Sequence, residues 1–127
     1  MTRCIQTALL SFDFLTTTTA VPFVGLESLR ETVNYNADRR RRISEISNEF
    51  LEVDFSFCQN DEDEIWMNHL ESAELHTVAK RGRQSLEFIE SLSQSKLIIC
   101  THSAYLRCIL NWGQTGGVPQ MFDQWLD

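Results

Sequence analysis

The chain has 127 residues, 43% of them hydrophobic and 23% charged, which is enough for one globular domain with its own core. Its 18 acidic and 11 basic residues give a net charge of −7, which disfavours general binding to nucleic acids or to anionic membranes. No apolar stretch approaches the length of a membrane span, and the first residues lack the apolar core of a secretory signal. We therefore expect a single cytoplasmic domain over residues 1–127.

The first part of the chain predicts a helix, a loop and a short strand. A helix over residues 3–12 is predicted by apolar residues spaced as on one helix face: Ile5, Ala8, Leu9 and Phe12. The four threonines at positions 16–19 predict that this helix ends in a loop. Residues 21–24 predict a short strand, which Pro22 limits to a sheet edge or to a strand start.

The middle of the chain combines charged runs with helical patterns. Ile43, Ile46 and Phe50 predict a helix directly after four consecutive arginines, Arg39 to Arg42. Positive charge at a helix start opposes the helix dipole, so we expect these arginines on a solvated face or in ion pairs, in part with the acidic run 61–64. That run lacks the glycine and the distal glutamate of a calcium loop and is expected to be a solvated loop. The longest helix is predicted over residues 70–93.

The stretch around His102 is the most informative part of the sequence. Residues 97–101 begin with an uninterrupted apolar run, which is typical of a strand buried on both faces. From Tyr105 the apolar period changes to that of a helix. His102 therefore lies between a strand end and a helix start, where unpaired N–H groups and the helix dipole favour anions. A histidine there can donate to a phosphate, although it can also cap the helix or bond the backbone.

Helices that alternate with apolar runs predict an α/β layer fold. The tail, residues 116–127, predicts a turn followed by a short amphipathic end. The cysteines show no paired spacing of the kind that binds metals: Cys4, Cys58, Cys100 and Cys108. We therefore expect reduced thiols in a cytosolic protein, without disulfides.

Three short stretches carry charged groups at predicted element ends. Thr2-Arg3-Cys4-Ile5-Gln6-Thr7-Ala8 has an arginine at a helix start, Leu29-Arg30-Glu31 has a carboxylate, and Cys100-Thr101-His102-Ser103 has the histidine. In this order they resemble three motifs of the histidine phosphatase superfamily, also called the phosphoglycerate mutase-like family. The usual forms of the first and last motifs are Ser-Pro-x-x-Arg-x-x-Gln-Thr-Ala and Thr-His-Gly. Residues 29–34 together with Asp38-Arg39-Arg40 look closest to a fungal branch of mutase-like proteins.

The resemblance implies a partial three-layer α/β/α fold and a phosphatase or mutase that acts on a phosphomonoester through a phosphohistidine, without a metal or organic cofactor. Arg3 would clamp the phosphate, Glu31 would donate a proton, and His102 would stabilise the transferring phosphoryl group. Ser103 is a further expected substrate contact. A contact of Arg39 or Arg40 with a substrate phosphate or carboxylate is the alternative to the solvated or ion-paired face expected for the arginine run. The residues alone leave other roles open, because Glu31 could be a helix cap or a surface carboxylate and Arg3 a solvated charge.

One motif of that family has no counterpart in the chain. The family's nucleophile is the histidine of an Arg-His-Gly motif on its first strand, and no Arg-His-Gly occurs in this sequence. We therefore expect a family member that lacks its first strand and is inactive as this chain. The alternative is a non-catalytic fragment that binds phosphate or another protein. The expected ligand is phosphate or a phosphorylated small molecule, and the unpaired strand at residues 97–101 predicts possible self-association.

Overall fold

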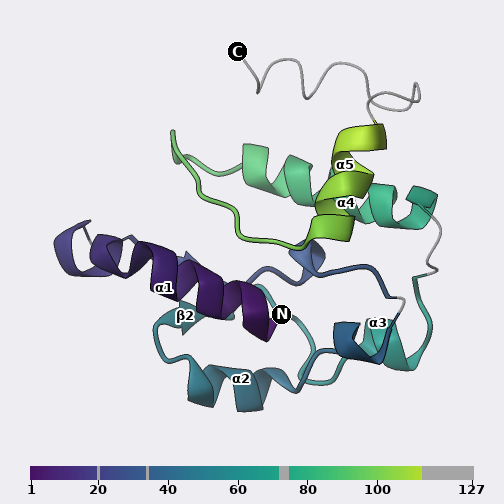
Figure 1. Cartoon of the computed structure of the whole chain (residues 1–127), viewed down its shortest axis with the longest axis horizontal. Coiled ribbons are helices and arrows are strands. Elements are labelled where there is room, and N and C mark those ends of the chain that lie inside the picture. Colours follow the sequence, from purple (N-terminus) through teal and green to yellow (C-terminus); the bar gives the residue numbers. More distant parts are fainter. Residues whose placement is uncertain (20, 34, 72–74, 113–127) are drawn as a thin grey trace.

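The computed structural model describes residues 1–19, 21–33, 35–71 and 75–112. Within these ranges the elements follow in the order α1 (Thr2–Thr19), β1 (Phe23–Val24), α2 (Ile43–Glu49), β2 (Val53–Asp54), α3 (Glu64–Met67), α4 (Leu75–Glu90) and α5 (Ser103–Trp112) (Figure 1). Two 3₁₀ turns, Glu27–Leu29 and Asn36–Asp38, lie between β1 and α2. None of the helices in these ranges is both long and apolar enough to cross a bilayer.

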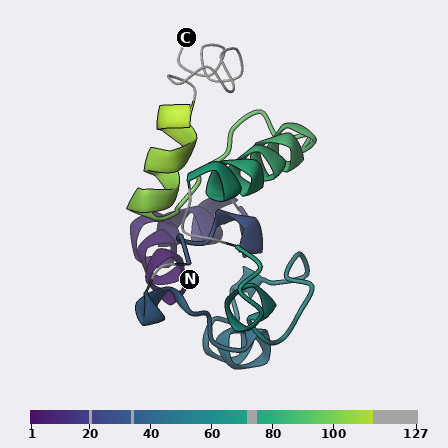
Figure 2. The same ribbon diagram turned by 90° about the vertical axis from the view of Figure 1, so that its right-hand side faces the viewer.

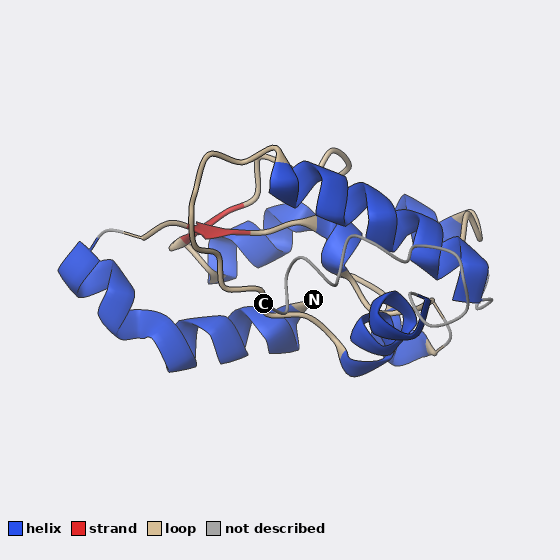
Figure 3. Ribbon diagram, turned by 90° about the horizontal axis from the view of Figure 1, so that it is seen from above, coloured by secondary structure: helices blue, strands red, loops and turns tan. Residues whose placement is uncertain are grey.

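A small parallel sheet joins two segments that are distant in the sequence. β1 pairs with β2, with Phe23 opposite Val53, and Figure 3 shows how small this sheet is beside the helices. Directly after β1, Gly25 leaves room for a ring, because a Cβ atom there would lie 2.6 Å from Cδ1 of Phe55. Helices with parallel strands confirm the α/β class, and the short strand expected within residues 21–24 is present.

Two groups of buried side chains hold the helices in place. The first joins α1, α2 and the segment after β2 through Ile5, Ile46, Phe50 and Phe55. The second joins α4 to α5 through Val78, Tyr105, Cys108 and Ile109. The two groups correspond to the two halves of the molecule in Figures 1 and 2, with α4 and α5 in one half and α1, α2 and α3 in the other. The segment with Glu31 contacts the start of α5, where the Glu31 carboxylate accepts from the amides of Ala104 and Tyr105.

The structure corrects two helix boundaries. α1 continues through the threonines to Thr19, so the predicted loop at residues 16–19 is wrong, and a non-helical Phe12 (φ −129°, ψ 15°) interrupts it earlier. Threonine lowers helix propensity by less than about 1 kcal/mol per residue, which is too little to end a helix by itself. α4 is shorter than predicted and ends at Glu90. Residues 72–74 and the predicted tail at 116–127 lie outside the described residues.

The predicted central strand at residues 97–101 does not form in the part of the chain that the structure describes. The segment has no strand assignment and makes no backbone hydrogen bond to other described residues. Its first three side chains are exposed rather than buried on both faces, with Leu97 40%, Ile98 60% and Ile99 42% exposed, and Cys100 and Thr101 are half-buried. A strand forms only where a neighbouring segment accepts and donates its backbone hydrogen bonds. The apolar pattern shows that residues 97–101 are suited to a strand, but it does not show that such a neighbour is present.

Candidate functional site at the start of helix α5

His102 occupies the N-cap position of α5, as the sequence predicts. Its carbonyl accepts the first helical hydrogen bond from the Leu106 amide at 2.9 Å. The residue is buried, with 8% of its surface exposed, and its ring makes no hydrogen bond to any described residue. A buried imidazole without such a partner keeps its donor and acceptor available for a ligand.

Glu31 caps the same helix. Its Oε1 accepts from the amides of Tyr105 and Thr32, both at 2.9 Å, and its Oε2 accepts from the amide of Ala104 at 3.4 Å. The carboxylate therefore sits at the positive end of the α5 dipole, where an oxyanion is most stabilised. Glu31 belongs to a segment 73 or more residues away in the sequence from these α5 amides. The region that the sequence predicts to favour anions thus holds an anion of the chain itself.

His102 and Glu31 lie side by side, with Nδ1 of the imidazole 4.0 Å from Oε2 of the carboxylate. Burial lowers the pKa of His102 below its ordinary 6.5 because the buried ring loses hydration of its charged form. The positive charges of the Met1 amino group and of Arg3 lower this pKa further, whereas the Glu31 carboxylate opposes them. The imidazole is therefore neutral at pH 7 and carries one N–H that it can donate.

Arg3 and Ser103 lie at the edge of this pair. Arg3 is on the first turn of α1 and is exposed, and it is close enough to His102 for its charge to affect the pKa of the imidazole. Ser103 is the first residue of α5 and is also exposed. Glu31 and His102 therefore lie together at the start of α5, and Arg3 lies near enough for its charge to act on the imidazole.

Arg40 has a structural role, which removes it from the substrate contacts expected from the sequence. A guanidinium has five N–H groups, and those of Arg40 meet five acceptors at 2.7–3.1 Å. These are Oε1 of Glu27 and the carbonyl oxygens of Asn60, Arg41, Asp61 and Glu62. No donor remains for a ligand. Arg39 is exposed, so a substrate contact by Arg39 stays a prediction.

The acidic run at 61–64 is not simply a solvated loop. Asp63 is 2% exposed, and its Oδ2 accepts from Nη2 of Arg30 at 2.9 Å and from the backbone amide of Arg40 at 2.7 Å. Burial alone would raise the pKa of Asp63, but the hydrogen bonds from Arg30 and Arg40 outweigh it, and the pKa is lowered. Ion pairing between the arginine run and the acidic run is present at Arg42 and Glu62, with 2.6 Å between Nε and Oε1.

Arg81 fixes the segment that carries Glu31, and the sequence reading missed it. From α4 its guanidinium donates to the carbonyl oxygens of Ser28 at 2.7 Å, Arg30 at 2.9 Å and Glu31 at 3.3 Å. It also forms a buried ion pair with Glu71, and its charge lies 4.7 Å from the centre of the Tyr105 ring. Arg81 lies three positions after Val78 and therefore on the inward, apolar face of α4. A charged residue on such a face is the sequence signal that could have indicated a buried anchor.

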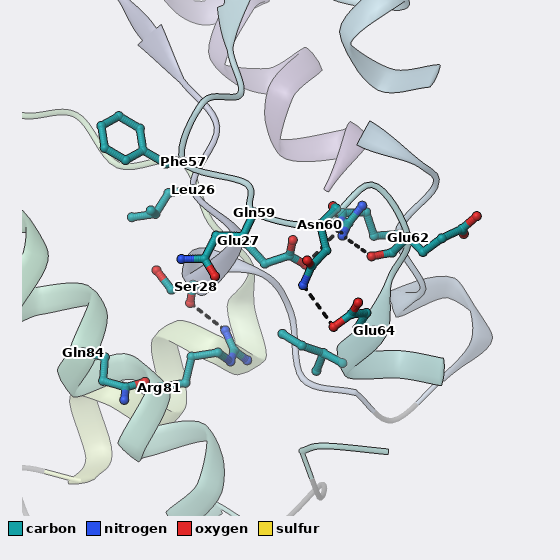
Figure 4. A pocket seen from close by; sticks show the side chains of 12 residues that line it. Leu26, Glu27, Ser28, Phe57, Gln59, Asn60, Glu62, Glu64, Arg81 and Gln84 are labelled. Carbon is teal, nitrogen blue, oxygen red and sulfur yellow. Dashed lines mark hydrogen bonds and ion pairs between the residues drawn. The ribbon is translucent and has the colours of Figure 1, made fainter. Parts of the chain in front are cut away.

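A separate cavity of about 420 Å³ lies beside this anchor (Figure 4). Its lining includes Leu26, Phe57 and Glu64 together with Arg40 and Arg81, and it does not include the residues at the start of α5. Both arginines already donate all their N–H groups to protein acceptors, so neither is free to bind an anion there. Among the described residues, no group of three His, Cys, Asp or Glu side chains is placed to hold a metal ion.

Comparison with known proteins finds one matching family and similar proteins from a plant. Residues 1–125 match the family described as "Histidine phosphatase superfamily (branch 1)". A curated "Phosphoglycerate mutase-like protein" of Arabidopsis thaliana is 32% identical over 91 residues, which cover 71% of this chain and 33% of that protein. "Phosphoglycerate mutase-like protein 1" of the same plant is 32% identical over 91 residues, covering 71% and 32%. The chain thus spans about one third of the length of these relatives. No solved structure is significantly similar to it.

Proposed function

Because the chain belongs to the histidine phosphatase superfamily, we propose that the start of α5 binds the phosphoryl group of a phosphomonoester. The observation that carries this proposal is the buried His102, which lies without a hydrogen bond from its ring to a described residue at the N-terminus of a helix that already stabilises a carboxylate. Those amides suit any oxyanion, and the imidazole N–H adds a donor at the same place.

Each residue has a distinct proposed role at this site. His102 donates to a phosphoryl oxygen, and the approach of a phosphate dianion favours protonation of its ring. Arg3 supplies an exposed positive charge near the pair, and its planar fork can contact two phosphate oxygens. Glu31 is the proposed acid for the leaving oxygen, a role in which its carboxylate first takes up a proton and leaves the α5 amides beside His102. Ser103 offers its hydroxyl and its backbone N–H at the first helical position.

We further propose that this chain alone binds phosphate without transferring it. Transfer through a phosphohistidine needs an imidazole nitrogen that bonds to phosphorus while the ester P–O bond breaks and the leaving oxygen is protonated. His102 has the donor role in this proposal and cannot attack from the opposite side. Of the other histidines, His69 is exposed beyond α3 and His76 lies in α4. Loss of a nucleophile costs several orders of magnitude in rate even when the surrounding charges remain.

The proposal is tested by measuring binding and turnover separately on the purified chain. Calorimetry with an aryl phosphate should show weak binding that His102→Ala and Arg3→Ala both reduce, whereas Arg107→Ala, which removes an exposed charge further along α5, should leave it unchanged. Release of the phenol should stay at the level of buffer. Binding that survives both substitutions would refute the site. Rapid hydrolysis abolished by His102→Ala would show instead that His102 is the nucleophile.

A further inference from the structure

The anion position at the start of α5 is filled by the protein itself. After the N-cap His102, the first amides of α5 belong to Ser103, Ala104 and Tyr105, and the last two donate to Glu31. The fourth amide, that of Leu106, bonds the His102 carbonyl. Of these first three amides, only that of Ser103 has no backbone or carboxylate acceptor among the described residues. A phosphate that approached the helix would therefore find one amide available.

We infer that Glu31 acts as a built-in competitor, so that phosphate binds at the start of α5 only when the Glu31 carboxylate leaves the amides of Ala104 and Tyr105. This inference rests on the proposed function, because it concerns the same phosphate site. A second observation marks the place as a ligand site: the His102 ring, although only 8% exposed, has the Glu31 carboxylate 4.0 Å away and no hydrogen bond to a described residue. The carboxylate thus stands where a phosphoryl oxygen would stand.

Charge strengthens the competition. A carboxylate and a phosphate dianion that share two amides would lie within a few ångström of each other, and like charges at such separations repel strongly in a partly buried site. Binding in the wild-type chain therefore includes the cost of moving Glu31 away. Glutamine at position 31 is neutral and has nearly the shape of glutamate. It therefore removes the repulsion and still fills the same space at the start of α5.

The movement required is local to the side chain. The backbone of Glu31 is held by Arg81, which donates to the Glu31 carbonyl at 3.3 Å and to the Arg30 carbonyl at 2.9 Å. Only the carboxylate has to rotate, and it gives up the amides of Thr32, Ala104 and Tyr105 when it does. The backbone of Glu31 thus stays in place while its carboxylate can be displaced.

The test compares phosphate affinity in the wild-type chain and in Glu31→Gln, with Glu45→Gln as the matched control. Glu45 is an exposed carboxylate in the first turn of α2, so its substitution removes the same charge away from the site. Calorimetric titration with inorganic phosphate at pH 7.5 and constant ionic strength should give at least tenfold tighter binding for Glu31→Gln, which corresponds to about 1.4 kcal/mol. Glu45→Gln should match the wild type.

A measurement on the unaltered protein keeps the inference testable if Glu31→Gln does not fold. In ¹³C-labelled wild-type chain, saturating phosphate should shift the carboxyl resonance of Glu31 as it loses its amide donors. Equal phosphate affinity in all variants with an unmoved Glu31 resonance would overturn the inference while leaving the phosphate site in place. Absence of phosphate binding in both the wild type and Glu31→Gln would overturn the inference and the proposed function together.

Discussion

Replacing Arg81 with methionine should destabilise the fold more than any other single change of an arginine in α4. Arg81 is 7% exposed, and its guanidinium donates five hydrogen bonds. Two go to the Glu71 carboxylate and three go to the backbone carbonyls of residues 28, 30 and 31. Methionine fills much of the volume but satisfies none of these acceptors.

The magnitude follows from what is left behind. Breaking a buried ion pair by removing one partner costs about 3–5 kcal/mol, because the remaining charge is uncompensated. The orphaned carbonyl groups add to this, since each buried unsatisfied acceptor costs about 1–3 kcal/mol unless water reaches it. Relaxation around Glu71 offsets part of that sum, so we expect a loss of about 3–5 kcal/mol. This is a large fraction of the roughly 5–15 kcal/mol that stabilises a typical domain.

The control lies two residues further along the same helix. Arg83 forms an exposed ion pair with Glu87 at 2.8 Å, with side chains 65% and 52% exposed, and such pairs contribute only about 0–1 kcal/mol. Urea unfolding followed by circular dichroism should give a much lower midpoint for Arg81→Met and a nearly unchanged one for Arg83→Met. Similar midpoints for the two variants would refute the conclusion that Arg81 anchors the segment with Glu31.

Three further outcomes follow from particular residues. Gly82→Ala should lower the unfolding free energy by about 1–3 kcal/mol, because the new Cβ would lie 2.8 Å from Cγ1 of Ile109. An unchanged melting temperature would show that α4 and α5 can separate freely. The lowered pKa of His102 means that the unfolded chain binds more protons as pH falls below about 6.5, so the unfolding free energy should decrease from pH 7.5 to pH 5.5. That decrease should be smaller in His102→Gln, and an identical pH dependence would contradict the assignment. If residues 97–101 mediate self-association, Ile98→Lys should lower the sedimentation-derived mass at high concentration, and an unaffected mass would exclude this segment as the contact.

Periodicity in the sequence predicts the existence of most of the helices, although it missed α3 and misplaced the end of α1. The apolar spacing after Tyr105 places the start of α5 correctly, and therefore also places His102 at its N-cap. The same reasoning failed at residues 97–101, because an apolar run reports what a strand would need without showing whether a hydrogen-bonding neighbour is present. Placement in a fungal branch of the family stays a prediction.

The sequence could not show which acceptors the buried arginines bind. Arg30 meets Asp63 across 33 positions, and Arg81 reaches the Ser28 carbonyl across 53 positions. Four adjacent arginines look alike as a charge run, although Arg40 is buried and saturated while Arg41 and Arg42 are exposed. A helix pattern can indicate an inward-facing charge such as Arg81, but the partners of a buried charge come from distant segments, and a local pattern contains no information about them.

The most direct test of the phosphate site is to observe the backbone amides at the start of α5 in ¹⁵N-labelled chain during titration with inorganic phosphate. Binding at this site should shift the amides of Ser103, Ala104 and Tyr105 together, with the same apparent affinity, and His102→Ala should weaken that response. Shifts confined to exposed basic residues such as Arg41 and Arg83, with the α5 amides unmoved at saturating phosphate, would contradict the proposal that this chain binds phosphate there.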